Sequence, residues 1–459
     1  MRFWRHCGQP WRRRNDVCPP EGIIFVTTAT AEPTADRATG MAGRWYVLMI
    51  MMLVYTINIA DRYVMSTVLE PIRLELKLDD GGIAFLTGVS LALFYVSLGI
   101  PLSWVADRYN RRNLLAVSLV IWSAMTALCG LSVGYWHLLL ARIGVGVGEA
   151  GGTPACNSIV ADYFPADRRA MAMTVFALGA PIGAWLGADM AGYVANLYGW
   201  RAAFLVLGVP GLFLGLIILM TIKEPERGRL DAVSTKETPT IAETVRFLRD
   251  QKAAFHVIMG GGVSALWGWG LMWFTPTFLQ RMYGLDVGQA GAVVGPIHLV
   301  AGIAASLLTA WLLSRPSFVD PRRIVWLLAI VTALATVPSF IAYWTHSLPL
   351  AKLMLWTFIP AIYFYIGPAM ALLLNLATPK MRAMTIAISL IAANVLNLIV
   401  APQGVGWLSD YFGGAAGPNA ESLRMALLIL APTGFWAAWH YWAASRTIIA
   451  DQMRAVGHV

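Results

Sequence analysis

Charged side chains are scarce in this sequence: Asp, Glu, Lys and Arg make up 13% of the 459 residues, against 58% hydrophobic residues. Soluble proteins carry about a quarter charged residues, so the composition excludes an ordinary water-soluble chain. Cysteine is rare as well. Two of the four cysteines lie in a polar N-terminal tail and two in apolar stretches, which excludes a disulfide framework.

The sequence also lacks the short motifs that carry enzyme chemistry. It contains no metal-ligand cluster, no nucleophile with a paired base and no glycine-rich phosphate loop. Catalysis and ATP-driven transport therefore have no support. We expect a protein that is not an enzyme and that holds neither a cofactor nor a metal ion.

What the chain does contain is a series of apolar stretches of about 20 residues or more, each long enough to cross a bilayer as a helix. From Trp45 onward we predict twelve spans, at about 45–69, 83–105, 113–133, 136–161, 170–196, 200–222, 253–280, 288–313, 324–345, 349–376, 383–409 and 423–445. The fold class is thus an all-α membrane protein with twelve transmembrane helices.

The net charge of +9 raises the question of a nucleic-acid partner. If the N-terminus is placed in the cytoplasm, most of the Lys and Arg residues fall in cytoplasmic segments, including the N-terminal tail and the long connection after span 6. This bias follows the positive-inside rule, so the basic charge reports topology and nucleic acid is not expected. We expect a multi-pass protein of the cell membrane, the inner membrane in a bacterium, with both termini cytoplasmic.

The two halves of the chain repeat each other in sequence. Asp79 lies before span 2 and Gly88 lies within it. The same pair recurs with the same spacing as Asp286 before span 8 and Gly295 within it. Two pseudo-symmetric six-helix bundles with a substrate site between them resemble the architecture of major facilitator transporters.

The predicted organisation has five parts. They are a disordered cytoplasmic tail at 1–43, a six-helix bundle at 44–223, a cytoplasmic linker at 224–252, a second six-helix bundle at 253–446 and a cytoplasmic tail at 447–459. Residues 241–248 of the linker have the pattern of an amphipathic helix on the membrane surface.

Spans 1 and 4 contain charged side chains: Asp61 and Arg62 in the first, Arg142 and Glu149 in the fourth. Charges in hydrocarbon are costly and normally face a bundle interior or a wet cavity. Two carboxylates beside two arginines can exchange a proton as their pairing changes, which is the physical basis of proton coupling. The alternative is a static ion-pair network that holds the two spans together, and one network can do both.

The connection between spans 2 and 3 reads S-W-V-A-D-R-Y-N-R-R from Ser103 to Arg112. It resembles the major facilitator loop signature G-x-x-x-D-R-x-G-R-R, with Ser and Asn at the two glycine positions. The resemblance implies that Asp107 latches the cytoplasmic side by facing the start of span 11 near Arg382, where a helix dipole favours a carboxylate. The alternative is a charged turn that only sets topology. The candidate latch residues are Asp107, Arg108, Arg111, Arg112, Arg168 and Arg169.

Over residues 45–225 the sequence resembles the spinster-like branch of the major facilitator superfamily. The resemblance rests on N-x-x-D-R at 58–62, D-R-Y-N-R-R at 107–112 and R-x-G-x-G-x-G-E-A at 142–150. It implies proton-coupled secondary active transport, by alternating access, of a lysolipid- or sphingoid-like molecule. The family's coupling residues correspond to Asp61, Arg62 and Glu149, to which we add Arg142.

Two other functions stay open. Organic-anion/proton symporters of the same superfamily share the N-x-x-D-R element, and a non-transporting membrane sensor could use the same fold. In either case the energy source of a transporter would be the proton gradient.

The second half offers an uncharged wall of aromatic and amide side chains, which suits a ligand with a polar head and an apolar tail. The candidate substrate-binding residues are Asn58, Trp273, His298, Tyr365, Asn394 and Asn397. For each of them the alternative is ordinary packing. The expected partners are an amphipathic or anionic small molecule, protons and the lipid bilayer, and we expect a monomer.

Overall fold

The computed structural model describes residues 41–225, 240–318, 320–378 and 380–456. Residues Arg44–Val459 form one compact unit. The predicted tail up to residue 40 and linker residues 226–239 lie outside the described residues. Every regular element of the described part is a helix.

The first half runs from α1 to α10, with short π-helical segments inside two of its spans. Its elements are α1 (Met41–Thr67), α2 (Leu69–Leu76), α3 (Asp80–Ala84), η2 (Phe85–Val89), α4 (Ser90–Arg108), α5 (Arg111–Cys129), α6 (Tyr135–Tyr163), α7 (Ala166–Ala177), α8 (Gly179–Trp185), η3 (Leu186–Met190), α9 (Ala191–Tyr198) and α10 (Trp200–Thr221).

The second half runs from α12 to α22 and is preceded and followed by one short helix each. Its elements are α11 (Ile241–Arg249), α12 (Lys252–Ser264), η4 (Ala265–Trp269), α13 (Gly270–Tyr283), α14 (Val287–Pro296), η5 (Ile297–Ala301), α15 (Gly302–Leu313), η6 (Pro316–Phe318), α16 (Pro321–Trp344), α17 (Leu348–Phe364), α18 (Ile366–Asn375), α19 (Arg382–Asn394), η7 (Val395–Val400), α20 (Ala401–Gly413), η8 (Gly414–Ala416), α21 (Ala420–Leu430), α22 (Thr433–Ala444) and α23 (Ile448–Val456).

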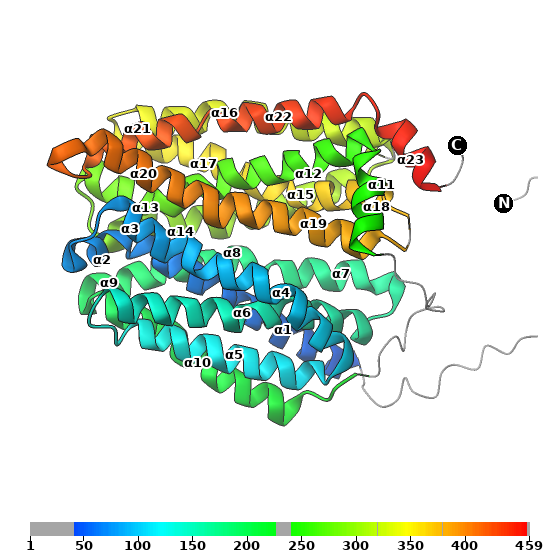
Figure 1. Cartoon of the computed structure of the whole chain (residues 1–459), viewed down its shortest axis with the longest axis horizontal. Helices are drawn as coiled ribbons and strands as arrows, with labels where there is room; N and C mark the ends of the chain where they lie inside the picture. Colours follow the sequence, from blue (N-terminus) through cyan, green and yellow to red (C-terminus); the bar gives the residue numbers. More distant parts are fainter. Residues whose placement is uncertain (1–40, 226–239, 319, 379, 457–459) are drawn as a thin grey trace, which may run out of the picture. The chain divides into compact units, whose positions relative to one another are not determined.

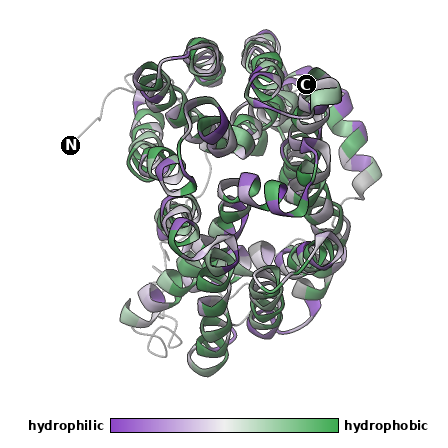
Figure 2. Cartoon of the chain, turned by 90° about the vertical axis from the view of Figure 1, so that its left-hand side faces the viewer, coloured by the Kyte–Doolittle hydropathy of each residue, from purple (hydrophilic) through white to green (hydrophobic). Residues whose placement is uncertain are grey.

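Eleven helices of the described residues are long and apolar enough to cross a membrane. The twelfth is α6, which has 29 residues and is less apolar because it carries Arg142, Glu149 and several glycines. Large apolar side chains such as Phe213 and Leu334 are 62% and 68% exposed, as a bilayer-facing surface requires. Seen along the helices, green hydrophobic ribbon predominates (Figure 2). The predicted twelve-helix membrane fold is confirmed.

The two six-helix bundles lie side by side, the first below and the second above in Figure 1. The side of the molecule where α10 finishes and α12 begins, on the right in Figure 1, is called the linker end. The opposite side is called the far end. The helix predicted within the linker is observed as α11, which begins with a capping box formed by Thr240 and Glu243. At the same end, Asp451 of α23 accepts a hydrogen bond of 2.8 Å from the Ala253 amide and so caps α12.

The sequence repeat corresponds to a shared structural device. Asp79 caps α3 by accepting the Gly82 amide at 2.7 Å, and Asp286 caps α14 by accepting the Gln289 amide, also at 2.7 Å. A carboxylate in this position satisfies a free amide of the first turn and is favoured by the helix dipole. The second membrane helix of each bundle therefore starts at the far end in the same way.

Candidate functional site

A cavity of about 240 Å³ lies between the two halves. Apart from Ala180 of α8, its first-half wall is one face of α1, because the other lining residues recur at intervals of three and four positions. They are Tyr55, Ile59, Arg62, Tyr63 and Ser66. Applying this helical periodicity to span 1 would have identified the aromatic members, which the sequence analysis missed.

The second-half wall is mainly aromatic and amide in character. Four of the predicted substrate-binding residues line it, namely Trp273, Tyr365, Asn394 and Asn397. The Trp273 indole nitrogen donates a hydrogen bond of 3.1 Å to the Asn397 side-chain oxygen, which orients both groups. The wall also includes Trp269, Met272, Tyr363 and Ser389.

The other two predicted substrate residues lie elsewhere. Asn58 borders a separate, much smaller pocket beside Trp122. His298 is fully buried, with its Nδ1 atom 2.9 Å from the Tyr363 hydroxyl and its ring 4.9 Å from the ring of Tyr63. His298 therefore supports two residues of the cavity wall from behind.

Arg62 connects the cavity to the buried charges. Its Nη2 and Nε atoms donate hydrogen bonds of 2.7 and 3.1 Å to one carboxylate oxygen of Glu149 on α6. The Glu149 side chain is fully buried, whereas that of Arg62 is 14% exposed. The guanidinium also lies over the ring of Tyr95, 4.9 Å from its centroid. A ligand in the cavity can thus reach an arginine whose counter-ion is shielded.

Asp61 and Arg142 are completely buried behind this pair. The Thr126 hydroxyl donates a hydrogen bond of 3.0 Å to one Asp61 oxygen. The other Asp61 oxygen, one Glu149 oxygen and the Arg142 guanidinium have no hydrogen-bond partner in the described part of the chain. The other three charges of the prediction, Arg62, Arg142 and Glu149, all act electrostatically on Asp61, so the structure brings the four together with capacity to pair differently.

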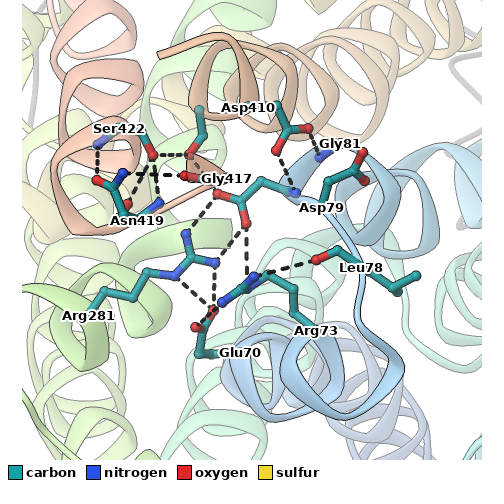
Figure 3. Close-up of polar contacts among 12 residues, drawn as sticks. Glu70, Arg73, Leu78, Asp79, Gly81, Arg281, Asp410, Gly417, Asn419 and Ser422 are labelled. Carbon is teal, nitrogen blue, oxygen red and sulfur yellow. Dashed lines mark hydrogen bonds and ion pairs between the residues drawn. The ribbon is translucent and has the colours of Figure 1, made fainter. Parts of the chain in front are cut away.

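At the far end, ion pairs join the two halves (Figure 3). Arg281 of α13 donates hydrogen bonds of 2.6 and 2.8 Å to Glu70 of α2 and of 2.7 and 2.8 Å to Asp80 of α3. Arg73, on the same half as both carboxylates, donates bonds of 2.8 and 3.0 Å to Glu70. The side chains of Arg281 and Asp80 are 7% and 0% exposed, so water is largely excluded from these contacts.

Asp410 of α20 strengthens the same junction. Its two oxygens accept the backbone amides of Asp80 and Gly81 at 2.8 and 2.7 Å, which are free donors at the start of α3. We call Glu70, Arg73, Asp80, Arg281 and Asp410 the far-end lock. Burial raises the pKa of Glu70, but hydrogen bonds from Arg73 and Arg281 outweigh it and leave that pKa below its ordinary value.

The family model of the Major Facilitator Superfamily matches residues 51–402. The chain belongs to the major facilitator superfamily. An MFS-type efflux pump of Mycolicibacterium smegmatis is 31% identical over 413 residues, covering 90% of this chain and 94% of the relative. The Danio rerio sphingosine-1-phosphate transporter SPNS2 is 29% identical over 231 residues, covering 49% and 45%.

A solved structure gives the same assignment. A bacterial homologue of the human lysosomal transporter Spinster, in an inward-facing and unoccupied conformation, is 30% identical with a TM-score of 0.77, covering 89% of this chain and 98% of the other. This superfamily member is therefore a spinster-like multi-pass membrane transporter, which confirms the family and the fold that the sequence motifs implied.

The superfamily loop signature makes contacts within the first half at the linker end. Arg111 donates hydrogen bonds to Asp162 at the end of α6 and, at 2.8 Å, to Glu224 after α10. Arg112 donates its backbone amide to the same Glu224, also at 2.8 Å. These contacts fix α5 against the neighbouring helix ends.

The contacts just described do not involve the latch predicted at Asp107. The side chain of Asp107 lies outside the described residues, and Arg108 and Arg168 are exposed. Arg169 donates a bond of 2.8 Å to the Ala161 carbonyl. A latch between Asp107 and the start of α19 stays a prediction.

The far-end lock was missed by the sequence analysis. A usable signal was the pair Asp79-Asp80 before span 2. One carboxylate suffices to cap the helix, so the second was free to bind a partner.

Proposed function

We propose that this protein is a proton-coupled secondary transporter that moves an amphipathic small molecule by alternating access. The observation that carries the proposal is the position of Arg62. This side chain both lines the cavity and pairs with the buried Glu149, so substrate binding and proton binding act on the same pair of side chains.

The coupling follows from charge balance. Asp61, Arg62, Arg142 and Glu149 sum to zero when all are ionised, and protonation of one carboxylate leaves a net positive charge beside the cavity. An anionic head group that binds Arg62 in a bidentate manner releases Glu149. Glu149 can then bind a proton or turn to the unpartnered guanidinium of Arg142.

The cavity supports an amphipathic substrate. Its polar groups, Arg62, Asn394 and Asn397, occupy part of a wall that is otherwise aromatic and apolar. The head group would contact those polar side chains and the tail would lie against Trp269 and Met272. The described substrate of the zebrafish relative, sphingosine-1-phosphate, has this division into an anionic head and an apolar tail.

The far-end lock supports an assignment of sides. If the linker end is cytoplasmic, as the basic residues of the sequence predict, the lock closes the outer side and this conformation corresponds to the inward-facing one of the Spinster homologue. The name of the mycobacterial relative, an efflux pump, favours export.

Transport by proteoliposomes under an imposed pH gradient tests the coupling. Asp61→Asn and Glu149→Gln each remove a titratable carboxyl while preserving shape, so both variants should fold and lose gradient-driven transport. Asp250→Asn, at an exposed carboxyl beyond α11, is the matched control and should transport normally. Normal coupling in both intramembrane variants would refute the assignment.

Competition by a chain-length series tests the substrate class. Burial of each added methylene should tighten binding by roughly 0.8 kcal/mol, and Trp273→Ala should flatten that dependence. If short tailless acids compete as well as long-chain lipids, an organic-anion symporter replaces the lipid proposal. Binding with no flux in any condition would leave a membrane sensor.

A further inference from the structure

A third intramembrane carboxylate lies outside the site described above. Asp189 belongs to η3, within the apolar span Met171–Tyr198, and the sequence analysis overlooked it. Its side chain is half-buried and one oxygen accepts a hydrogen bond of 2.9 Å from the Trp185 indole. No Lys, Arg or His of the described residues forms an ion pair with it, unlike Asp80 or Glu149.

Helix packing gives the depth of Asp189 in the bundle. Span 5 runs parallel to α1, because a Cβ atom added to Gly187 would lie 2.5 Å from the Ala60 carbonyl, and one added to Gly183 would lie 2.4 Å from the Thr56 carbonyl. Two residues beyond Gly187, Asp189 is therefore level with Arg62. The carboxylate therefore lies inside the apolar span and away from its ends.

Asp189 faces the second half instead of α1. A Cβ atom added to Gly295 of α14 would lie 2.6 Å from the Asp189 Cβ and 3.2 Å from the Trp185 ring. One turn further on, Tyr193 is 63% exposed, so this flank of the span reaches the outer surface of the bundle. The carboxylate thus lies at the seam between the halves, on the side reached by lipid.

Few titratable groups surround this position. The segment α14 contains none, and η5 contributes His298, whose Nδ1 is bonded to the Tyr363 hydroxyl. From α1, Tyr63 packs against that same histidine, and Arg62 is paired with Glu149 of α6. None of these groups supplies a cation beside Asp189.

A charged group inside a membrane almost always faces a partner. A carboxylate next to an indole is complementary to an ammonium group, which forms charge-assisted hydrogen bonds with the oxygens and is attracted to the aromatic face. We propose that Asp189 and Trp185 form a second binding site, at the seam between the halves, for the ammonium group of an amphiphile that enters from the bilayer.

Binding of a long-chain amine to the full-length protein in maltoside micelles tests the site. The probes are hexadecylamine and N-hexadecylacetamide, which share the tail and differ in charge. Wild type should bind the amine about tenfold or more tightly, as expected for a hydrogen bond to a charged group. Asp189→Asn should reduce this preference to about one, because it keeps an acceptor for the indole but removes the charge, whereas the control Asp250→Asn should keep the preference.

Trp185→Phe provides a second variant that leaves the carboxylate in place. It should lower the preference for the amine while the acetamide binds as before. Absence of a preference in wild type, or an unchanged preference in both variants, overturns the site.

Two further measurements identify the source of the amine. If Asp189→Asn lowers the amount of phosphatidylethanolamine that copurifies, relative to phosphatidylglycerol, and leaves transport unchanged, the occupant is a bilayer lipid. If it abolishes hexadecylamine transport, the occupant is cargo. The binding assay uses no pH gradient, so its outcome is independent of proton coupling through Asp61 and Glu149.

Discussion

Removing Arg281 should open the far end of the transporter. This residue is the cation of the far-end lock that comes from the second half, and both of its carboxylate partners, Glu70 and Asp80, come from the first. Arg281→Gln therefore leaves two buried carboxylates at the junction with only Arg73 to balance them. In the conformation open at the far end the same carboxylates face water, so the substitution penalises only the closed state.

The size of the effect follows from burial. Removing one partner of a buried ion pair costs about 3–5 kcal/mol because the other charge is left uncompensated. At the lower figure the ratio of closed to open molecules falls by roughly a hundredfold, since about 1.4 kcal/mol corresponds to a factor of ten. If wild type is closed at the far end in most molecules, the Arg281→Gln variant would then populate the open state substantially.

Distances between spin labels measure this change. Labels at Val133 and Ala415, both exposed at far-end turns of opposite halves, should give a longer and broader distribution in Arg281→Gln. Arg424→Gln is the matched control, because it removes a far-end arginine whose ion pair, with Glu421, lies entirely within the second half. Equal distributions for wild type and Arg281→Gln, or an equal shift in the control, would show that the lock does not hold the halves together.

Three further outcomes are expected. Gly291→Leu should also favour the far-end-open state in the same label assay, because a Cβ at this position would lie 2.2 Å from a backbone carbonyl of η3; an unchanged distribution would contradict this packing argument. Because the pKa of Glu70 in the lock lies below its ordinary 4.5, closure should be constant between about pH 5 and 8 and weaken only in stronger acid, so a transition near neutral pH would have to come from another group. If Asp107 latches the linker end, Asp107→Ala should lengthen the distance between labels at Tyr109 and Pro316, and no change would leave it a topology residue.

Much of the architecture follows from the sequence because the bilayer restricts the chain to a few solutions. A backbone in hydrocarbon must satisfy its own hydrogen bonds, so each apolar stretch becomes a helix. The repeat of Asp79 and Gly88 as Asp286 and Gly295 gave the two-bundle organisation, and both aspartates are helix caps. The rarity of charge in hydrocarbon likewise singled out Asp61, Arg62, Arg142 and Glu149 as a group.

Only the tertiary structure decided which side chains share one space. Span periodicity gives the face of a helix but not the neighbour that this face meets, so Trp273 and Asn394 line the cavity while His298 lies behind it. The far-end lock joins Asp80 to Arg281 over a long stretch of sequence, and no local pattern encodes such a pair. Local rules determined the helices and their order, whereas the packing of the two bundles, which depends on contacts distant in sequence, determined the cavity and the lock.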